Sequence, residues 1–477
     1  MTDKNTAPCP NFRKCGGCQL QNLPYSEQLL HKQRQLVSLL GEFCHVNDII
    51  GMDEPTHYRN KVCAALGLDR QRHIISGIYQ TGSHSIIPVD ECMIEDKISD
   101  SIIVDIRNML RGFKIQAFDE RSGTGWLRHV LVRRGFQSGQ VMVVLVAVSP
   151  IFKLQKPFLK KLTELHPEIT TVVLNVNDRF GPVVLGSREK VLLGDGYIED
   201  SLLGLRFRIS PRSFYQINPV QTERLYSIAI EMAGLTGKEL VLDAYCGVGT
   251  IGLCAAGKAG QALGVELNRD AVKDAIINAK LNGIKNCWFA AGDAGKYMED
   301  MSTGGKRPDV VFMDPPRSGS SPQFLSSLLR AAPKRIVYIS CGPDSLRRDL
   351  DVLVSGGYRV SRIQPVDMFP YTNHVETVVL LSKLSDAKHH VEVELNLDEM
   401  DLTSAESKAT YDEIKAYVRE HAGLNVSKLY IAQTKRKCGI IERENYNLPK
   451  SEDSKQPQCP PEKEAAIKDA LKRFGMI

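Results

Sequence analysis

The stretch Val241-Leu-Asp-Ala-Tyr-Cys-Gly-Val-Gly-Thr-Ile-Gly252 decides the fold of this chain. It continues an apolar run that begins at Leu240, and Gly247, Gly249 and Gly252 have the spacing G-x-G-x-x-G. This spacing is typical of a buried strand that turns sharply into a helix, where absent side chains let a ligand approach the backbone. The stretch therefore predicts a nucleotide-like ligand beside Gly247 and Gly249, without identifying that ligand.

Apolar runs alternate with helical patterns throughout the region after Val220 that surrounds this stretch. The predicted strands are Leu240–Asp243, Ala262–Glu266, Trp288–Ala291, Asp309–Asp314, Arg335–Ser340, Tyr358–Pro365 and Thr377–Ser382. Such alternation predicts a doubly wound, mostly parallel sheet, and sheets of this kind bind ligands at the carboxyl ends of their strands. Residues that end these strands are therefore the candidates for function.

The rest of the chain predicts further regions. His57 to Ser210 is rich in strands, with helices expected near Ile102–Leu110 and Lys156–Leu165, which indicates one α+β domain. Ahead of it, Ser26 is the expected N-cap of an amphipathic helix whose apolar residues are Leu29, Leu30, Leu36, Val37 and Leu40. After Lys383, a linker-like stretch precedes helices expected near Tyr411–His421, near Val426–Lys437 and from Glu462.

The composition is that of an ordinary globular protein. Of 477 residues, 43% are hydrophobic and 25% are charged, which excludes a mainly disordered or fibrous chain. The longest apolar run, Val141–Val148, is far shorter than the roughly 20 residues of a membrane-spanning helix, and Met1–Pro10 lacks the apolar core of a signal peptide. We therefore expect a cytoplasmic protein with reduced cysteines. A net charge of +5 gives no argument for nucleic acid by itself.

Acidic residues at the strand ends distinguish between nucleotide-like ligands. Glu266 lies 19 residues after Gly247, where a carboxylate can accept both hydroxyls of a ribose, as NAD or S-adenosylmethionine would require. Asp314-Pro-Pro-Arg317 favours S-adenosylmethionine, because it places a carboxylate and a rigid loop near a sulfonium and the group to be methylated. Asp293, after the third strand, is the expected contact of the adenine amino group.

A cysteine and a carboxylate at the same sheet edge predict covalent chemistry. Cys341 follows the fifth strand, and this position favours a reactive thiolate over a buried, inert thiol. His374 and Glu376 precede the last strand, and either could accept a proton. With a methyl donor, these groups suit methylation of a pyrimidine at C5. Thiolate addition at C6 makes C5 nucleophilic, and a base then removes the C5 proton.

The chain resembles the RNA uracil-5 methyltransferase family. The resemblance extends from about Cys9 to Lys383 and lies in Ser213-Phe-Tyr-Gln-Ile-Asn-Pro219, the Asp243 glycine loop, Asp314-Pro-Pro-Arg317, Ser340-Cys-Gly-Pro343 and His374-Val-Glu376. It implies that Cys341 is the nucleophile, that Glu376 is the base and that Phe214 stacks near the target base. It also implies a donor site made of Gln216, Tyr245, Glu266, Asp293 and Asp314. Many members have Cys-Asn-Pro where this chain has Cys-Gly-Pro, a difference that concerns substrate positioning.

Four cysteines form a candidate metal site. Cys9, Cys15 and Cys18 have the spacing C-x5-C-G-G-C, and Cys92 is the expected fourth ligand. From spacing alone, zinc fits at least as well as an iron-sulfur cluster. Members of the family branch that acts on large-subunit ribosomal RNA carry this pattern and bind a [4Fe-4S] cluster, so the resemblance implies that cluster and 23S ribosomal RNA as substrate. Cys44 and Cys63 match no ligand position and are expected in the core.

The predicted fold class is α/β. A cluster loop at 1–24, with Cys92, is followed by an amphipathic helix at 25–51 that packs on the catalytic domain, and then by a central α+β domain at 52–213. A doubly wound, Rossmann-like class I methyltransferase domain occupies 214–384, a linker 385–408, and a small, basic helical extension 409–477. The extension contains a basic segment with one acidic residue, Glu442, and five basic residues: Lys428, Lys435, Arg436, Lys437 and Arg443. Such a segment is typical of a solvated helix face and equally of an RNA contact. We hypothesise that the extension replaces part of the RNA binding that a small N-terminal β-barrel provides in many relatives.

Three other functions stay open at this point: methylation of transfer RNA, a non-catalytic RNA-binding assembly factor, and an NAD-dependent dehydrogenase. The cluster cysteines disfavour the first, Cys341 with Glu376 disfavours the second, and the Asp314 motif disfavours the third. The sequence predicts an RNA partner. It identifies neither the uridine nor the oligomeric state, for which a monomer is the default expectation.

Overall fold

The computed structural model of the chain describes residues 9–120, 122–179, 181, 183–384, 411–438 and 459–474. Contacts divide the chain into two units, residues 1–389 and 390–477. The predicted linker at 385–408 lies outside the described residues, as do Glu442 and Arg443.

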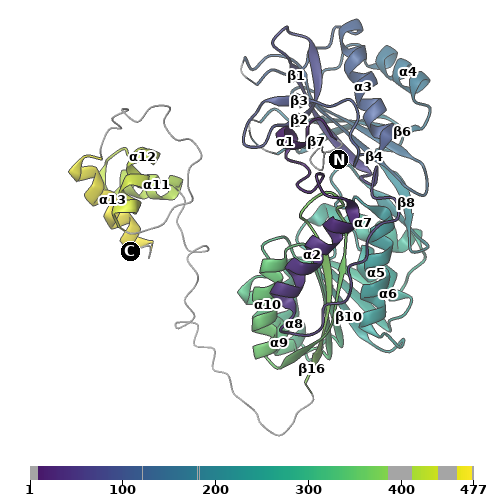
Figure 1. The fold of residues 1–477 in the computed structure, drawn as a ribbon, viewed down its shortest axis with the longest axis vertical. Helices are drawn as coiled ribbons and strands as arrows, with labels where there is room; N and C mark the ends of the chain where they lie inside the picture. Colours follow the sequence, from purple (N-terminus) through teal and green to yellow (C-terminus); the bar gives the residue numbers. More distant parts are fainter. Residues whose placement is uncertain are drawn as a thin grey trace, which may run out of the picture. The chain divides into compact units, whose positions relative to one another are not determined.

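A seven-stranded sheet forms the C-terminal half of the first unit (Figure 1). Its strands are β10 (Leu240–Ala244), β11 (Gln261–Glu266), β12 (Cys287–Ala291), β13 (Val310–Met313), β14 (Arg335–Ser340), β15 (Tyr358–Val366) and β16 (Glu376–Lys383). Their order is β12-β11-β10-β13-β14-β16-β15, with β10 to β14 parallel and β16 antiparallel to both neighbours. The predicted doubly wound sheet is confirmed, and each predicted strand end lies within one residue of the observed one.

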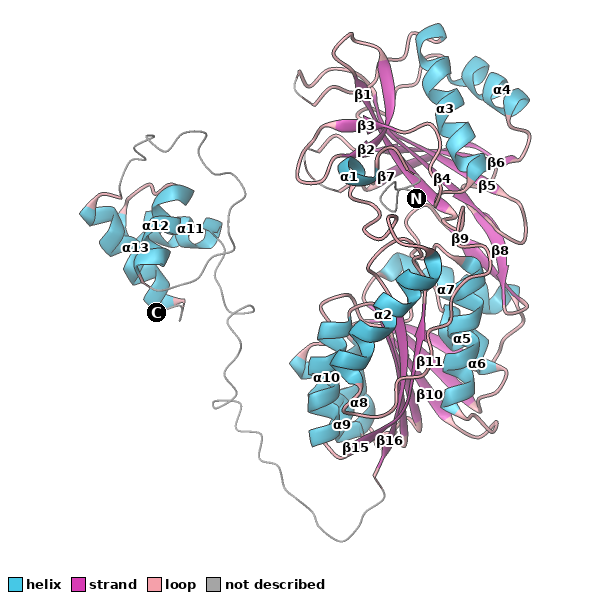
Figure 2. Cartoon of the chain, in the orientation of Figure 1, coloured by secondary structure: helices cyan, strands magenta, loops and turns pink. Residues whose placement is uncertain are grey.

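Helices cover both faces of this sheet (Figure 2). α5 (Pro219–Ala233), α6 (Thr250–Ala256) and α7 (Arg269–Leu281) contribute to the core on one face. α8 (Ala294–Thr303), α9 (Pro322–Ala331) and α10 (Pro343–Ser355) contribute to the core on the other. The central strands are therefore buried on both sides, which explains why their sequences are continuous apolar runs.

The central domain is built on a second seven-stranded sheet, of order β3-β2-β1-β4-β5-β6-β7. Its strands are β1 (Lys61–Leu68), β2 (Ile74–Tyr79), β3 (Ile86–Pro88), β4 (Leu127–Arg134), β5 (Val141–Ala147), β6 (Ile169–Val176) and β7 (Arg188–Leu193). The predicted helices are confirmed as α3 (Lys97–Gly112) and α4 (Gln155–Leu165), which pack on one face. On the other face, Met142, Val144 and Val146 join the core that contains α5 and the hairpin β8 (Ile198–Leu202) and β9 (Leu205–Ile209).

The N-terminal region contains the short α1 (Phe12–Cys15) and the longer α2 (Tyr25–Leu40). The predicted N-cap is wrong, because α2 begins at Tyr25 after Pro24 and Ser26 lies inside the helix. The predicted apolar face is also partly wrong, since Leu30 and Val37 are exposed. The buried positions are Gln28, Lys32, Leu36 and Leu40. Leu36 and Leu40 join the core beneath α10, and the two polar residues are buried because a later loop supplies their partners.

The second unit is a bundle of three helices, α11 (Tyr411–Ala422), α12 (Lys428–Lys437) and α13 (Pro461–Arg473). These three helices lie close to the positions that the sequence predicts. Its small core consists mainly of Ile414, Val418, Ile431, Ile467 and Leu471. Among the basic residues noted in the sequence, Lys435 is buried, whereas Lys437 is exposed and pairs with Glu464.

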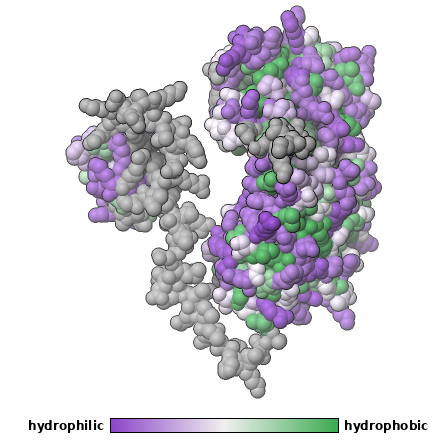
Figure 3. Space-filling view, viewed as in Figure 1, coloured by the Kyte–Doolittle hydropathy of each residue, from purple (hydrophilic) through white to green (hydrophobic). Residues whose placement is uncertain are grey.

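The surface is mostly hydrophilic on the face seen in Figure 3, with hydrophobic residues in small groups. The long apolar runs lie inside, and every residue from Val141 to Ala147 is fully buried. A search of the described helices finds none that combines the length and the apolar character needed to span a bilayer.

Candidate active site

The edge formed by the carboxyl ends of β10, β11, β13 and β14 collects most of the predicted site residues. Asp243 is the second-to-last residue of β10, and Glu266 is the last residue of β11. Asp314 and Cys341 directly follow β13 and β14. Because β16 is antiparallel, its amino end lies at the same edge. Ser340 pairs with Thr377 in the β14–β16 ladder, so Cys341 and Glu376, the next residue in each direction, lie opposite one another.

The glycine loop after β10 is held from below by two carboxylates. Glu266 Oε2 accepts a hydrogen bond from Gly247 N at 3.1 Å, and Asp243 Oδ2 accepts one from Gly252 N at 2.7 Å. A Cβ at position 252 would lie 3.0 Å from Asp243 Oδ2, so any side chain there would crowd this carboxylate. At Gly247 a Cβ would meet nothing within 4 Å, which shows that the loop is open in front.

These residues fit S-adenosylmethionine. The loop residues Tyr245, Gly247 and Gly249 have positive φ values of 66°, 54° and 83°, which turns the backbone sharply ahead of α6. Asp243 is fully buried, its Oδ1 has no hydrogen-bond partner, and burial raises its pKa to about 8, with Asp314 and Glu266 adding to the effect. An acidic, open cradle of this kind suits a cationic donor with a ribose and an adenine.

The other predicted donor residues differ in exposure. Asp293 caps α8 through an Oδ1 that accepts from Lys296 N at 2.9 Å, and the residue is exposed beyond the end of β12. Tyr245 packs its ring against Phe324, with centroids 5.2 Å apart. Gln216 is buried in the loop before α5. Tyr245 and Asp293 therefore lie on loops that follow strands of the methyltransferase sheet, whereas Gln216 lies on the loop that precedes α5.

Glu376 is a buried carboxyl group without a complete set of partners. Its residue is only 4% exposed, and Oε2 has no hydrogen-bond partner. Burial and then Asp314 raise its pKa to about 8, while Arg317 acts in the opposite direction. Burial also raises the pKa of Asp314 to about 7. Two neighbouring carboxyl groups in a poorly solvated site resist carrying charge together, so one proton is retained near neutral pH.

Cys341 is half-buried in the same field. Burial, followed by Glu376 and Asp314, raises the pKa of its thiol to about 11, while Arg317 acts in the opposite direction. The thiol is therefore protonated in the free site at neutral pH. His374 lies beside Phe369 with ring centroids 6.2 Å apart, and burial together with Arg317 and Lys32 lowers its pKa.

The departure from Cys-Asn-Pro has a structural reason that the sequence does not reveal. A Cβ at Gly342 would lie 2.8 Å from the carbonyl oxygen of Arg317 and 2.8 Å from Ser345 Oγ. Ser345 Oγ donates to that same carbonyl at 2.9 Å. The loop of Cys341 and the loop of Asp314 thus touch, and glycine permits the contact.

Phe214 is presented to solvent by a firmly held loop. It is 66% exposed, which is unusual for an aromatic side chain beside a buried segment. The fully buried Arg133 donates to Ser213 O at 2.9 Å, and Ser213 Oγ donates to Asp274 Oδ2 at 2.6 Å. Sequence reasoning missed both supports. Arg133 lies in a strand that also carries Arg128, His129 and Arg134, so nothing in the sequence singles it out.

The cysteines of the candidate metal site gather near one another without forming a ligand group. Cys9, Cys15 and Cys18 influence one another electrostatically, and Cys18 and Cys92 both pack on the small cluster of Met52, Tyr58 and Ile94. Burial raises the pKa of Cys18 to about 11 and that of Cys92 to about 12. Within the described part of the chain, no three His, Cys, Asp or Glu side chains are arranged to hold a metal ion. The predicted cluster is therefore not confirmed.

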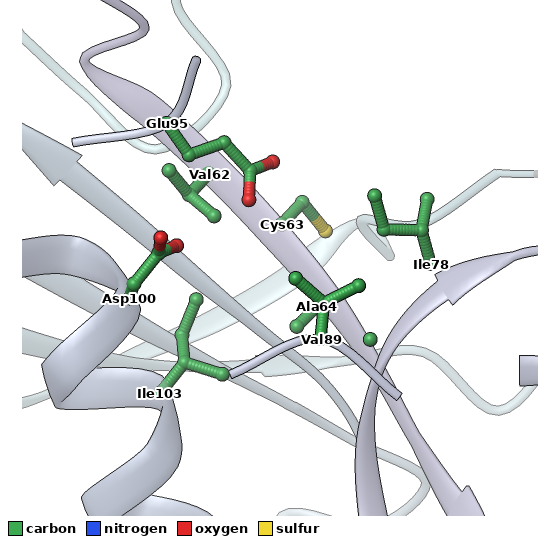
Figure 4. A pocket seen from close by; sticks show the side chains of 9 residues that line it. Val62, Cys63, Ala64, Ile78, Val89, Glu95, Asp100 and Ile103 are labelled. Carbon is green, nitrogen blue, oxygen red and sulfur yellow. The ribbon is translucent and has the colours of Figure 1, made fainter. Parts of the chain in front are cut away.

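The two remaining cysteines of interest lie against cores, as expected. Cys44 packs on the core beside α2, and Cys63 packs on the core that includes α5. Cys63 also lines a pocket of the central domain with Glu95 and Asp100 (Figure 4). Burial raises the pKa of both carboxyl groups, to about 7 for Glu95 and about 6 for Asp100.

The fold and the site together define a class of enzyme. A doubly wound sheet of this strand order, a glycine loop after the first strand and acidic residues at the following strand ends are the features of an S-adenosylmethionine-dependent methyltransferase. Residues 24–384 match the model of the tRNA (uracil-5-)-methyltransferase family, and the chain belongs to that family. The predicted enzyme class, an S-adenosylmethionine-dependent RNA (uracil-5-)-methyltransferase, is thereby confirmed.

Relatives and a solved structure agree with this placement. An uncharacterized RNA methyltransferase of Halalkalibacterium halodurans is 44% identical over 384 residues, which is 80% of this chain and 84% of the relative. One of Clostridium acetobutylicum is 43% identical over 389 residues, with 80% and 84% covered. The crystal structure of Pyrococcus abyssi tRNA (uracil-54, C5)-methyltransferase in complex with S-adenosyl-L-homocysteine is 28% identical, has a TM-score of 0.65, and covers 77% of this chain and 86% of its own.

Proposed function

We propose that this enzyme methylates C5 of a uridine in 23S ribosomal RNA through a covalent adduct with Cys341. The observation that carries the proposal is the pairing of Cys341 with Glu376, a buried carboxyl group with an unpartnered oxygen, at the edge that also holds the donor cradle. A base with no competing partner is free to accept a proton from substrate.

The roles of the two residues follow from the chemistry of C5. Once ionised, Cys341 Sγ bonds to C6 of the uracil, and the electron pair that this addition frees makes C5 nucleophilic. S-adenosylmethionine supplies the methyl group that C5 takes up, and S-adenosylhomocysteine leaves. Glu376 then accepts the C5 proton, and the C6–S bond breaks to regenerate the Cys341 thiolate.

The charge state of the free site requires a change before reaction. Both Cys341 and Glu376 hold their protons near neutral pH, since burial raises their pKa values to about 11 and about 8. A cationic donor beside Asp314 stabilises the charged forms of all three groups. The site is therefore prepared by the charge of the donor, and the thiol stays inert until the donor is bound.

The donor contacts that we propose extend the geometry of the cradle. Glu266 accepts the ribose hydroxyls, Asp293 accepts from the adenine amino group, and Asp314 lies toward the sulfonium. Gln216 and Tyr245 complete the cradle with Gly247 and Gly249. Phe214 stacks near the target base, which its exposure on a rigid loop supports.

We further propose a [4Fe-4S] cluster on Cys9, Cys15, Cys18 and Cys92. The donor set supports it, because Cys18 and Cys92 pack on one small apolar cluster and Cys9 and Cys15 act electrostatically on Cys18. Burial raises the pKa of Cys15, Cys18 and Cys92, and a bound cation would favour their ionised forms. The side chains would have to rotate to reach a common centre, and no step of the methyl transfer involves them. The same C-x5-C-G-G-C pattern is the reason for choosing 23S ribosomal RNA.

Transfer RNA is the second candidate substrate. It is favoured by the family description and by the Pyrococcus abyssi enzyme, whose name assigns it uracil-54 of transfer RNA. Mapping of 5-methyluridine in ribosomal and transfer RNA from a deletion strain separates the two. Loss from 23S RNA, restored by the wild-type gene but not by a Cys341→Ala gene, supports the proposal. Loss confined to transfer RNA replaces it with the second candidate.

A further inference from the structure

The loop Asp367–Asn373 joins β15 to the residues that deliver Glu376. It contains an unusual backbone conformation, because Tyr371 has a φ of 68° although it carries a bulky side chain. A tyrosine adopts this left-handed conformation only when surrounding contacts hold it there. The position of the loop is therefore imposed on it from outside.

A buried ion pair holds the start of this loop. Lys32 Nζ on α2 lies 2.6 Å from Asp367 Oδ1 and donates to Phe369 O at 3.1 Å, and both charged side chains are fully buried. Tyr25 Oη, also on α2, donates to Asp367 Oδ2 at 2.9 Å. Each oxygen of the carboxylate thus has its own donor from the same helix.

The strained residue is held at both of its backbone polar groups. Tyr371 N donates to Gln28 Oε1 of α2 at 2.9 Å. Its carbonyl oxygen accepts from Gln19 N at 3.0 Å and from Leu20 N at 2.9 Å. The side chains of Tyr25, Gln28 and Lys32, which we call the α2 clamp, therefore fix the loop at two points.

Among the described residues, no comparable set of hydrogen bonds orients the carboxyl group of Glu376 itself. Its Oε2 has no hydrogen-bond partner, so its direction depends on the backbone that enters β16. A buried ion pair is also a poor way to gain stability, because desolvation offsets most of the attraction, whereas its directional bonds specify one geometry. The α2 clamp is therefore suited to fixing the orientation of the loop that leads into β16.

We propose that Lys32 is a positioning residue for methyl transfer, which through Asp367 fixes the loop that aims Glu376 at the C5 proton. This inference rests on the proposed role of Glu376 as the base. It assigns Lys32 to the last stage of the reaction, the resolution of the methylated adduct, and not to the attack by Cys341 on the other strand.

The test is single-turnover methylation of a substrate RNA, with the covalent protein–RNA adduct followed on denaturing gels. In Lys32→Met we expect adduct formation within about threefold of wild type and resolution slowed by about ten- to a hundredfold, the usual effect of a small misplacement. Arg34→Met, on the exposed side of the same helix, is the matched control and should resolve normally.

A second variant separates aiming from stability. Lys32→Met leaves a buried, unpaired carboxylate and can destabilise the fold, whereas Lys32→Met/Asp367→Asn removes both charges. If the clamp aims the base, the double variant recovers thermal stability but still resolves the adduct slowly. If the double variant resolves the adduct at the wild-type rate, or if Lys32→Met slows formation and resolution equally, the positioning role is overturned.

Glu376→Gln keeps this inference distinct from the proposed function. That variant should accumulate adduct irrespective of Lys32. Adduct in Glu376→Gln combined with normal resolution in Lys32→Met rejects the positioning role alone. Absence of adduct in Glu376→Gln rejects the base assignment, and with it the inference.

Discussion

Alkylation of Cys341 tests the electrostatics of the site directly. Iodoacetamide reacts with the thiolate and not with the thiol. With a pKa of about 11 instead of the ordinary 9.0, the ionised fraction at pH 8 falls from about 9% to about 0.1%. At equal access, Cys341 should therefore react roughly a hundredfold more slowly than an ordinary small thiol at this pH.

Two substitutions should change the rate in opposite directions. The pKa of Glu376 is about 8, so its carboxyl group is mostly ionised at pH 9. Glu376→Gln removes this negative charge beside Cys341. The pKa of Cys341 should therefore fall, and labelling should become about three- to tenfold faster, as expected for removal of a charge in a partly solvated site. Arg317→Met removes the opposing positive charge and should slow labelling by a similar factor.

The assay is timed labelling of the free enzyme from pH 7.5 to 10, with the Cys341 peptide quantified by mass spectrometry against N-acetylcysteine in the same tube. The near-isosteric change to glutamine keeps access to the sulfur comparable. Labelling at pH 8 as fast as the small thiol would refute the reasoning. A shift of both variants in the same direction would refute it equally.

Three further predictions concern the role of Cys341 in methyl transfer, the cysteine cluster and the C-terminal extension. Cys341→Ala should abolish methyl transfer while S-adenosylhomocysteine binding, measured by calorimetry, stays near normal; residual turnover above about a hundredth of wild type contradicts the nucleophile assignment. Anaerobically purified enzyme should be brown with about four irons per chain, lost in Cys92→Ser and kept in Cys44→Ser, whereas colourless protein with one zinc contradicts the cluster. Truncation after Leu384 should spare catalysis on a short RNA but weaken RNA binding. Each lost phosphate contact should reduce the salt slope of log affinity by about 0.7 to 0.9, and an unchanged slope leaves the extension a solvated appendage.

The central strands could be predicted because they are buried on both faces. Two-sided burial requires uninterrupted apolar residues, so the runs beginning at Leu240 and Arg335 mark their own ends in the sequence. Residues at those ends, such as Asp314 and Cys341, are then placed by topology alone. The antiparallel direction of β16 was the additional fact needed to set Glu376 opposite Cys341.

The parts that escaped prediction depend on partners far away in the chain. Apolar periodicity assigned Leu30 and Val37 to the buried face of α2, but both are exposed. Lys32 is buried instead, because it forms an ion pair with Asp367. No local sequence pattern predicts a buried ion pair between two such distant residues. The supports of Phe214 were missed for the same reason, since Arg133 comes from a different domain.

The buried pair also has a consequence for synthesis of the chain. Lys32 leaves the ribosome 335 residues before Asp367. Because the chain is synthesised at about 5 to 20 residues per second, Asp367 follows Lys32 after roughly 17 to 67 s. During this time the buried face of α2 lacks its final partner. Throughout that interval Gln28 and Lys32 stay hydrated, so two of the four positions that will finally be buried offer no apolar surface to other nascent chains. A helix with an entirely apolar face would spend the same interval as an aggregation hazard.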